Sequence, residues 1–184
     1  MGYPLILSEQ SRPPLQNMKN YFHHLINFPK LDEVYIDDAL KSTYTFHEYP
    51  VSYSAGSLRF KNTNFFKLMK LKFGANNPSF IKLNPWTLYN WHTDKERNCA
   101  INWVLKSNPK ASTLYKDTLE RKHIHDIVEV DYRLLYPTIL DTTHPHCVIN
   151  NSDEERIILS LSIDGNFDYV SVRNYLSNIK VVNY

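Results

Sequence analysis

The feature that most constrains the fold is a series of short apolar and aromatic segments that begins at Phe80 and continues to the last part of the chain. Within them the side chains alternate with a period of two, which is typical of β-strands. Turn-forming sequences such as Asn84-Pro85 and Asp164-Gly165-Asn166 separate the segments. Many short strands at this spacing predict an all-β sandwich or barrel. The expected strands are residues 80–83, 87–94, 99–106, 112–116, 127–130, 133–135, 147–150, 156–163 and 169–172.

The first part of the chain has a mixed pattern. Residues 15–27 carry apolar side chains at helical spacing and are followed by Pro29, which predicts a short helix. Residues 34–36 are expected to form a short strand, and residues 42–53 strands that break at Pro50. A cluster of potential N-caps, Asn62-Thr63-Asn64, precedes an amphipathic segment over 65–73, and Gly74 follows it. This arrangement predicts a capped helix with a glycine stop.

Composition narrows the class of protein. The 184 residues are 42% hydrophobic and 22% charged, as expected for one globular domain with a full core. The chain has only four glycines and no Gly-rich phosphate-binding loop, and its net charge of +2 does not indicate a nucleic-acid partner. No apolar run is long enough to span a membrane, so a cytoplasmic location is expected. The two cysteines, Cys99 and Cys147, are expected to be buried free thiols.

Three potential metal ligands lie on the predicted strands or directly beside them. His92 and Asp94 are two positions apart, and such positions share one face of an extended strand. His146 lies later in the chain, directly before the apolar segment Cys147-Val148-Ile149. Two histidines and one carboxylate, with further positions left open, form the ligand set of non-haem Fe(II) oxygenases. His144 shares strand parity with His146, so periodicity alone leaves both open as the distal ligand; we favour His146 because of the apolar segment after it.

Arg156 opens another apolar strand, Arg156-Ile157-Ile158-Leu159. A buried arginine needs an anionic partner, and its planar fork suits a carboxylate. A dicarboxylate cosubstrate would supply that partner. The alternative is a surface ion pair with Asp153 or Glu154.

Taken together, the His92-x-Asp94 motif, the distal His146 and Arg156 resemble the Fe(II)- and 2-oxoglutarate-dependent dioxygenases, in particular their small microbial and phage members. The prolyl hydroxylase-like and aspartyl/asparaginyl hydroxylase-like branches are the most similar. The resemblance covers about residues 80–164, and the spacing from His146 to Arg156 also matches the family. Four elements in the correct order are far more specific than a lone His-x-Asp.

The resemblance implies a double-stranded β-helix, also called a jelly roll, over residues 80–172, with residues 1–75 as a buttress of helices and strands. It implies Fe(II) bound by His92, Asp94 and His146, with 2-oxoglutarate and dioxygen (O2) as cosubstrates. Arg156 would bind the distal carboxylate of 2-oxoglutarate. The expected reaction is hydroxylation of an unactivated C–H bond in an amino-acid side chain, a peptide or a small metabolite, with release of succinate and CO2.

Asn102 is the next candidate for binding 2-oxoglutarate, because it is a polar residue on an otherwise apolar strand and the aspartyl hydroxylase-like branch has a polar ligand near this place. Its side chain could equally lie on an exposed face. Tyr115 is a weaker candidate for the same pocket. Two positions depart from the family pattern: Ala100 where one branch often has arginine, and Ile158 where several branches have serine. Four aromatic residues near the motif could line a pocket or belong to the core: Trp86, Tyr89, Trp91 and Trp103.

Two other classes of protein remain open from the sequence. One is a non-oxidative jelly-roll metalloprotein, such as an isomerase or a hydrolase. The other is a catalytically inactive binding protein that keeps the fold. A dioxygenase would produce succinate from 2-oxoglutarate, whereas a non-oxidative metalloprotein would not. An inactive binding protein would differ from both because it would bind no metal.

Overall fold

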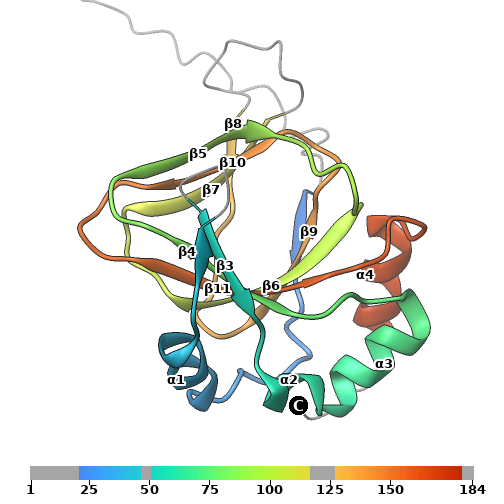
Figure 1. Cartoon of the computed structure of the whole chain (residues 1–184). Helices are drawn as coiled ribbons and strands as arrows, with labels where there is room; N and C mark the ends of the chain where they lie inside the picture. The colour runs from blue at the N-terminus through green and yellow to red at the C-terminus, as the bar shows by residue number, and fades with distance from the viewer. Residues whose placement is uncertain (1–20, 47–50, 117–126, 180–184) are drawn as a thin grey trace, which may run out of the picture.

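The computed structural model describes residues 21–46, 51–116 and 127–179, and within these ranges the strands form two antiparallel sheets that face each other (Figure 1). In spatial order, the larger sheet contains β1 (Phe22–His24), β9 (Pro137–Asp141), β6 (Cys99–Lys106), β11 (Arg156–Ser162), β4 (Ser79–Leu83), β3 (Val51–Ala55) and β2 (Thr45–Phe46). The smaller sheet contains β5 (Thr87–His92), β10 (His146–Asn150), β7 (Ala111–Lys116) and β8 (Ile127–Glu129).

From β4 onward the chain passes back and forth between the two sheets. β4, β6, β9 and β11 belong to the larger sheet, and β5, β7, β8 and β10 belong to the smaller one. This winding makes the fold a double-stranded β-helix, which confirms what the family resemblance implied. The first 75 residues also contribute to the larger sheet, because β1 pairs with β9 and β3 pairs with β4.

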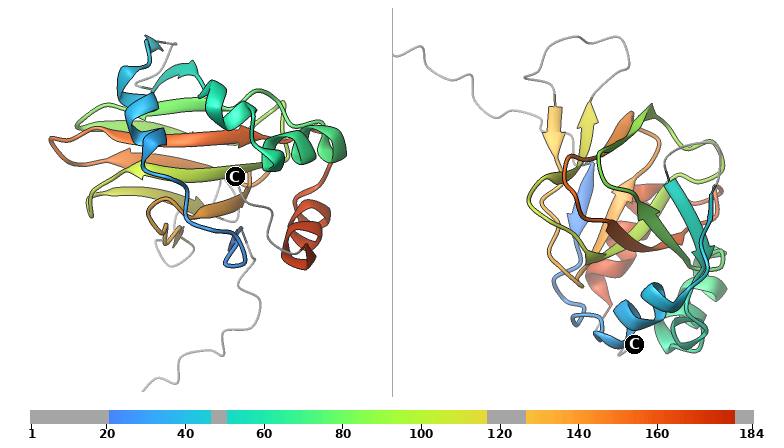
Figure 2. Two further views of the ribbon diagram at one scale, coloured as in Figure 1. Left: turned by 90° about the horizontal axis from the view of Figure 1, so that it is seen from below. Right: turned by 60° about the vertical axis from the view of Figure 1, so that its left-hand side comes forward.

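The helices cover the outer face of the larger sheet (Figures 1 and 2). They are α1 (Val34–Lys41), α2 (Leu58–Lys61), α3 (Asn64–Phe73) and α4 (Tyr169–Asn178). The main core lies between these helices and the sheet. At its centre Trp103 of β6 is fully buried, and its ring lies 5.1 Å from that of Phe60 and 5.8 Å from that of Phe65.

The central strand β6 is buried on both faces, and this double burial shapes the site. Seven of its eight residues are buried, so its exposure does not alternate. Ile101 and Trp103 pack into the core beneath the helices, whereas Ala100 and Asn102 line a cavity between the two sheets. The outer face of this sheet therefore stabilises the fold, and the inner face is free to build a binding site.

The predicted capped helix is confirmed. The Oγ1 atom of Thr63 accepts a hydrogen bond from the backbone N–H of Phe66 at 3.1 Å, so Thr63 is the N-cap of α3. Gly74 ends the helix with a φ of 58°, in the left-handed region that glycine adopts at little cost. Cys99 and Cys147 are buried free thiols, as expected.

Three predicted strands are wrong. Residues 34–36 belong to helix α1, which buries Tyr35 and Ala39 one turn apart. Residues 169–172 begin helix α4, whose N-cap Asp168 accepts a hydrogen bond from the N–H of Ser171 at 2.9 Å. Residues 133–135 form a turn, because Leu135 has a φ of 65°, which a strand does not allow.

The helix predicted over residues 15–27 is wrong where the structure describes it. Phe22–His24 forms strand β1, because pairing with β9 outweighs the local helical pattern. The earlier part of that segment lies outside the described residues. None of the helices in the described ranges is long and apolar enough to cross a membrane, and the cellular compartment remains a prediction.

Candidate metal centre and its cavity

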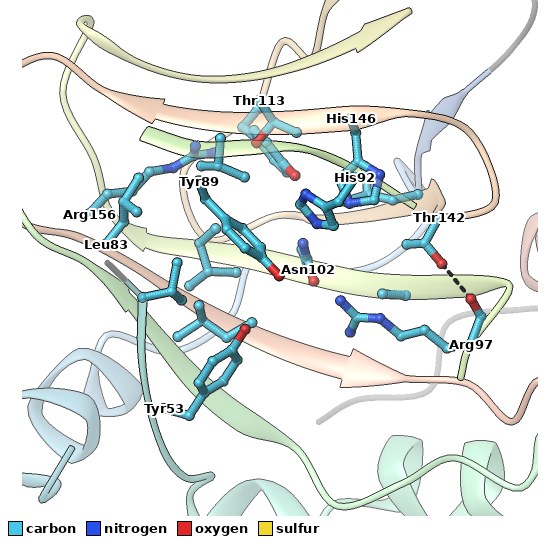
Figure 3. A pocket seen from close by; sticks show the side chains of 17 residues that line it. Tyr53, Leu83, Tyr89, His92, Arg97, Asn102, Thr113, Thr142, His146 and Arg156 are labelled. Carbon is cyan, nitrogen blue, oxygen red and sulfur yellow. Dashed lines mark hydrogen bonds between the residues drawn. The ribbon is translucent and has the colours of Figure 1, made fainter. Parts of the chain in front are cut away.

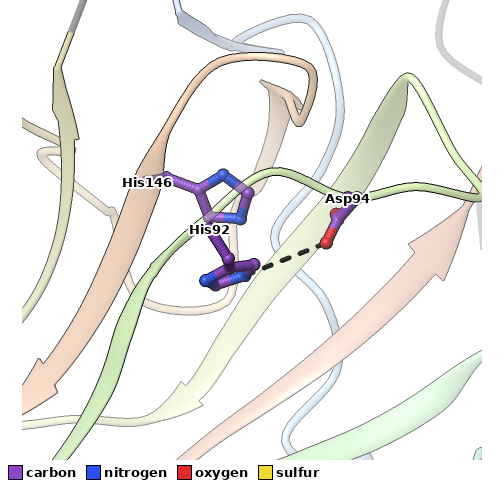
Figure 4. A group of neighbouring side chains, drawn as sticks. All are labelled: His92, Asp94 and His146. Carbon is purple, nitrogen blue, oxygen red and sulfur yellow. Dashed lines mark ion pairs between the residues drawn. The ribbon is translucent and has the colours of Figure 1, made fainter. Parts of the chain in front are cut away.

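His92 and His146 lie directly opposite each other on neighbouring strands. His92 is the last residue of β5, His146 is the first of β10, and the two form a cross-strand pair. Their ring centroids are 4.3 Å apart. The antiparallel register thus brings together two histidines that are far apart in the sequence (Figure 4).

Asp94 completes the group from a loop. The sequence predicted a strand that continues through Asp94, but β5 ends at His92 and Asp94 lies just beyond it. One carboxylate oxygen, Oδ1, is 3.8 Å from Nε2 of His92. The three side chains each offer a ligand atom, and these atoms all lie within 4.8 Å of one another (Figure 4). The residues predicted as metal ligands therefore meet at one point.

Backbone carbonyls orient both imidazoles. The Nδ1 atom of His92 lies 2.6 Å from the carbonyl oxygen of Asn90, and Nδ1 of His146 lies 2.9 Å from that of His144. A carbonyl can only accept, so Nδ1 carries the proton and donates it in both rings. In the neutral ring this leaves the lone pair on Nε2, which is the atom that can bind a metal. Burial also lowers the pKa of His146, which favours the neutral ring.

His144, the competing candidate for the distal ligand, points elsewhere. Its Nδ1 lies 3.1 Å from Oδ2 of Asp141, and its ring packs 5.1 Å from the ring of Tyr21. It does not belong to the group of potential ligands found among the described residues. The structure thus favours His146 over His144, a distinction that strand parity could not make.

A cavity between the sheets extends from the two histidines to Arg156 (Figure 3). Its volume is about 60 Å³, on the order of four to six times what one buried water requires. This space suits a small organic molecule. Its walls include the apolar side chains of Val51, Ile81, Leu83, Leu140, Val148 and Ile158.

Among the residues that the structure describes, Arg156 is a buried cation that forms no ion pair, although the carboxylate of Glu129 is near enough to favour its charge. Its side chain is only 1% exposed, and its Nε and Nη1 atoms have no hydrogen-bond acceptor within the described part of the chain. The surface ion pair considered from the sequence does not form there: Glu154 pairs instead with Lys106, at 3.9 Å. The guanidinium lies 5.1 Å from the ring centroid of Tyr132. Burial lowers the pKa of Arg156, but an arginine remains charged in proteins.

Other unsatisfied polar atoms line the same cavity. Asn102 is 9% exposed, and its Oδ1 has no partner among the described residues; the same holds for Oγ1 of Thr113 and the hydroxyl of Tyr132. Buried polar groups almost always have a partner, so a cluster of exceptions in one cavity indicates a polar occupant. Asn102 therefore faces the cavity rather than the surface.

Tyr115 has a different place from the one expected. It lies on β7, its ring stacks on Tyr21 at 5.1 Å and approaches that of His146 at 5.4 Å, and it is not among the cavity-lining residues in the described ranges. Its buried hydroxyl has no partner there, and burial raises its pKa well above 10. Tyr115 thus packs against the ring of His146 and does not line the cavity in the described ranges.

The four aromatic residues near the motif differ in their roles. Tyr89 lines the cavity, and Trp103 belongs to the core beneath the helices. Trp86 is 63% exposed. The ring of Trp91 stacks beneath the ammonium group of Lys116, at 4.3 Å. Only one of the four therefore contributes to the site.

Sequence reasoning missed Arg97. Its Nε donates to Oδ2 of Asp94 at 2.7 Å, and Arg97 also lines the cavity (Figure 3). The only signal in the sequence was its position three residues after a proposed ligand, inside a polar turn.

No protein-family model matches the sequence, and no curated protein matches it. Solved structures do match the fold. A prolyl hydroxylase from Trichoplax adhaerens, in complex with a peptide fragment of the hypoxia-inducible factor oxygen degradation domain, has a TM-score of 0.57 at 9% identity. The match covers 80% of this chain and 85% of the hydroxylase.

Two bacterial proteins are similar to a comparable degree. HygX from Streptomyces hygroscopicus, with nickel, 2-oxoglutarate and hygromycin B bound, has a TM-score of 0.55 at 8% identity, covering 73% of this chain and 78% of HygX. A 2-oxoglutarate–Fe(II) oxygenase from Burkholderia pseudomallei has a TM-score of 0.52 at 10% identity, covering 72% and 77% of the two chains. At these identities the likeness establishes a shared fold.

Proposed function

We propose that this protein is an Fe(II)- and 2-oxoglutarate-dependent dioxygenase. The observation that carries the proposal is a single cavity with two complementary ends. His92 and His146 of the His-Asp-His group lie at one end (Figure 3). The guanidinium of Arg156, whose Nε and Nη1 have no acceptor among the described residues, lies at the other. A ligand that binds a metal through one end and carries a carboxylate at the other fits both.

The donor set fits Fe(II). Two imidazole nitrogens and one carboxylate oxygen, with other coordination positions open, are the ligands of non-haem Fe(II) oxygenases. Neighbouring ligand atoms on one octahedral ion lie about 3 Å apart, because metal–ligand bonds are about 2.1 Å long. The ligand atoms here lie within 4.8 Å of one another. A contraction of less than about 2 Å brings them onto one ion, which side-chain rotation can supply.

The far end of the cavity fits the distal carboxylate of 2-oxoglutarate. Arg156 can donate from Nε and Nη1, and the Thr113 and Tyr132 hydroxyls can donate beside it. Thr113 thus offers a hydroxyl in a chain that has Ile158 where related branches often have serine. The Asn102 side chain, midway along the cavity, can bond the keto-acid end (Figure 3). When bound here, Fe(II) and 2-oxoglutarate would supply an oxidant from O2, with release of succinate and CO2.

The residues of the chain position these groups and exclude water. Apolar side chains from both sheets line the cavity, so electrostatic contacts inside it are stronger than in water. The backbone acceptors at Asn90 and His144 hold the two imidazoles in the form that binds metal.

An outer groove next to the His-Asp-His group of His92, Asp94 and His146 offers space for a substrate. It has a volume of about 420 Å³, far larger than the inner cavity, and four residues line both spaces: Tyr53, Tyr89, His92 and Arg97. We propose that the substrate binds in this groove and exposes a C–H bond beside the metal. The groove suits an amino-acid side chain, a peptide or a small metabolite, and hydroxylation is the proposed outcome.

The test is succinate production from 2-oxoglutarate by purified protein supplied with Fe(II) and O2. The proposal predicts slow turnover even without substrate, and its loss in His92→Ala and Asp94→Ala, while His144→Ala keeps it. A protein that binds metal but makes no succinate would be a non-oxidative jelly-roll enzyme. A protein that binds no metal would be a catalytically inactive binding protein.

A further inference from the structure

The loop that carries Asp94 is fastened to the rest of the fold by its backbone. Thr142 is 1% exposed, and its backbone carbonyl accepts a hydrogen bond from the N–H of Asp94 at 3.0 Å. The backbone N–H of Thr142 donates to the carbonyl of Asn98 at 3.1 Å. Its hydroxyl donates to the carbonyl of Arg97 at 2.9 Å. These bonds fix the loop backbone, but they leave the carboxylate of Asp94 free to rotate.

The side chain of Arg97 restricts that rotation. Its Nε donates to Oδ2 of Asp94 at 2.7 Å, and its Nη1 donates to Oγ of Ser162 at 2.7 Å. Both side chains of the ion pair are largely buried, with 24% and 16% exposure. The guanidinium thus connects the loop to β11 in the larger sheet, whereas an ordinary surface ion pair has no such third contact.

The two oxygens of Asp94 consequently have different environments. Oδ2 is held by Arg97, whereas Oδ1 lies 3.8 Å from Nε2 of His92 and faces the other ligands. We propose that Arg97 is a positioning residue that makes Asp94 a one-oxygen metal ligand, so that a second coordination position is not taken by Oδ2. The inference rests on the proposed function in one respect, namely that the His-Asp-His group binds a metal.

The planar fork of arginine is essential to this role. Its Nε and Nη1 donors have a fixed relative direction, so the contacts of Nη1 with Ser162 at 2.7 Å and Ser160 at 3.4 Å restrict where Nε meets Asp94. A lysine would keep the charge but could not make both bonds with one rigid group. Arg97→Lys therefore separates the effect of geometry from the effect of charge.

The experiment measures Co(II) binding to apo-protein by calorimetry, together with the visible absorption of bound Co(II), which reports ligand number and geometry. The variants are Arg97→Lys, Arg97→Met and Ser162→Ala. Lys95→Met is the matched control, because it removes a cation from an exposed position of the same loop. Thermal unfolding without metal shows that each variant is folded, and Ser162→Ala carries the test if a change at Arg97 prevents folding.

We expect Arg97→Lys to weaken Co(II) binding roughly tenfold or more and to change the absorption spectrum, as loss of an outer contact to a ligand typically does. Ser162→Ala should change both in the same direction but less, and Lys95→Met should match the wild type. The inference is overturned if the wild type binds Co(II) but the two Arg97 variants bind it equally well or better with an unchanged spectrum. If the wild type binds no Co(II), the proposed function fails first and the inference fails with it.

Discussion

The substitution Arg156→Met tests whether the buried guanidinium serves a ligand or serves the fold. Arg156 is 1% exposed and has no ionic partner among the described residues. A buried charge without an ion pair costs on the order of 3–5 kcal/mol. The ring of Tyr132 and the nearby carboxylate of Glu129 offset about 2 kcal/mol or more of that cost. Methionine fills similar space without a charge. Without cosubstrate the variant should therefore be as stable as the wild type, or up to about 3 kcal/mol more stable.

The same change should greatly weaken 2-oxoglutarate binding. A hydrogen-bonded pair with a charged group contributes about 2–3 kcal/mol, so the dissociation constant should rise roughly 30- to 150-fold. Metal binding should be unaffected, because Arg156 lies at the far end of the cavity from the potential ligands His92 and His146 (Figure 3).

Two assays separate these effects. Thermal unfolding without ligand gives the stability, and each 1 kcal/mol should shift the midpoint by about 2–4 °C for a chain of this size. Titration of 2-oxoglutarate into metal-loaded protein gives the affinity. A variant that is clearly destabilised without ligand, yet binds 2-oxoglutarate as the wild type does, would refute the reasoning and make Arg156 a structural residue.

Three further predictions concern single groups. His146→Ala should abolish metal binding measured by calorimetry, while His144→Ala should leave it nearly unchanged; the reverse result would exchange their roles. Thr113→Val removes a hydroxyl without a partner at nearly constant volume, so it should leave stability intact and raise the 2-oxoglutarate dissociation constant about 2- to 10-fold; destabilisation with unchanged affinity would contradict this. Burial raises the pKa of Cys99 from 9.0 to about 12, so the folded state holds this proton more tightly than the unfolded state. Its contribution to stability is complete below pH 9 and is lost as the pH rises from about 9 to about 12. Chemical unfolding across that range should show a smaller loss for Cys99→Ala, and an equal loss would contradict the reasoning.

The parts of the fold that were predicted correctly are those with strong local patterns. Strand β6 has the bounds expected from its apolar sequence, and α3 has both its cap at Thr63 and its stop at Gly74. The strands that carry His92 and His146 were also predicted, with bounds one or two residues from the observed ones. These patterns follow from backbone geometry and are present in the sequence before any tertiary contact forms.

The missed elements depend on tertiary contacts or on brief signals. β1 forms because β9 provides a partner, and β9 itself begins at Pro137, a residue that argues against a strand in sequence alone. Helix α4 had a usable signal in its N-cap Asp168, but its first four residues are also typical of a strand. The prediction followed the short aromatic and β-branched sequence, whereas the structure follows the cap and forms a helix.

The site shows the same division. The three potential metal ligands were singled out because their types and order are distinctive. The sequence favoured His146 over His144, and the register between β5 and β10 places His146 opposite His92. Arg97 gave no periodic signal, since its partners Asp94 and Ser162 lie in a loop and on a distant strand. Contacts of that kind are determined by the assembled fold.

The most direct test of the account is the visible charge-transfer absorption of Fe(II) bound together with 2-oxoglutarate, recorded without oxygen. The band requires that 2-oxoglutarate is bound to the iron ion. It therefore tests the three potential ligands His92, Asp94 and His146 and the cavity in one measurement. The account predicts that the band appears in the wild type when both are added, that it is absent in Asp94→Ala, and that Arg156→Met needs far more 2-oxoglutarate to reach it. A wild-type protein that shows no band at saturating Fe(II) and 2-oxoglutarate would contradict the proposed function.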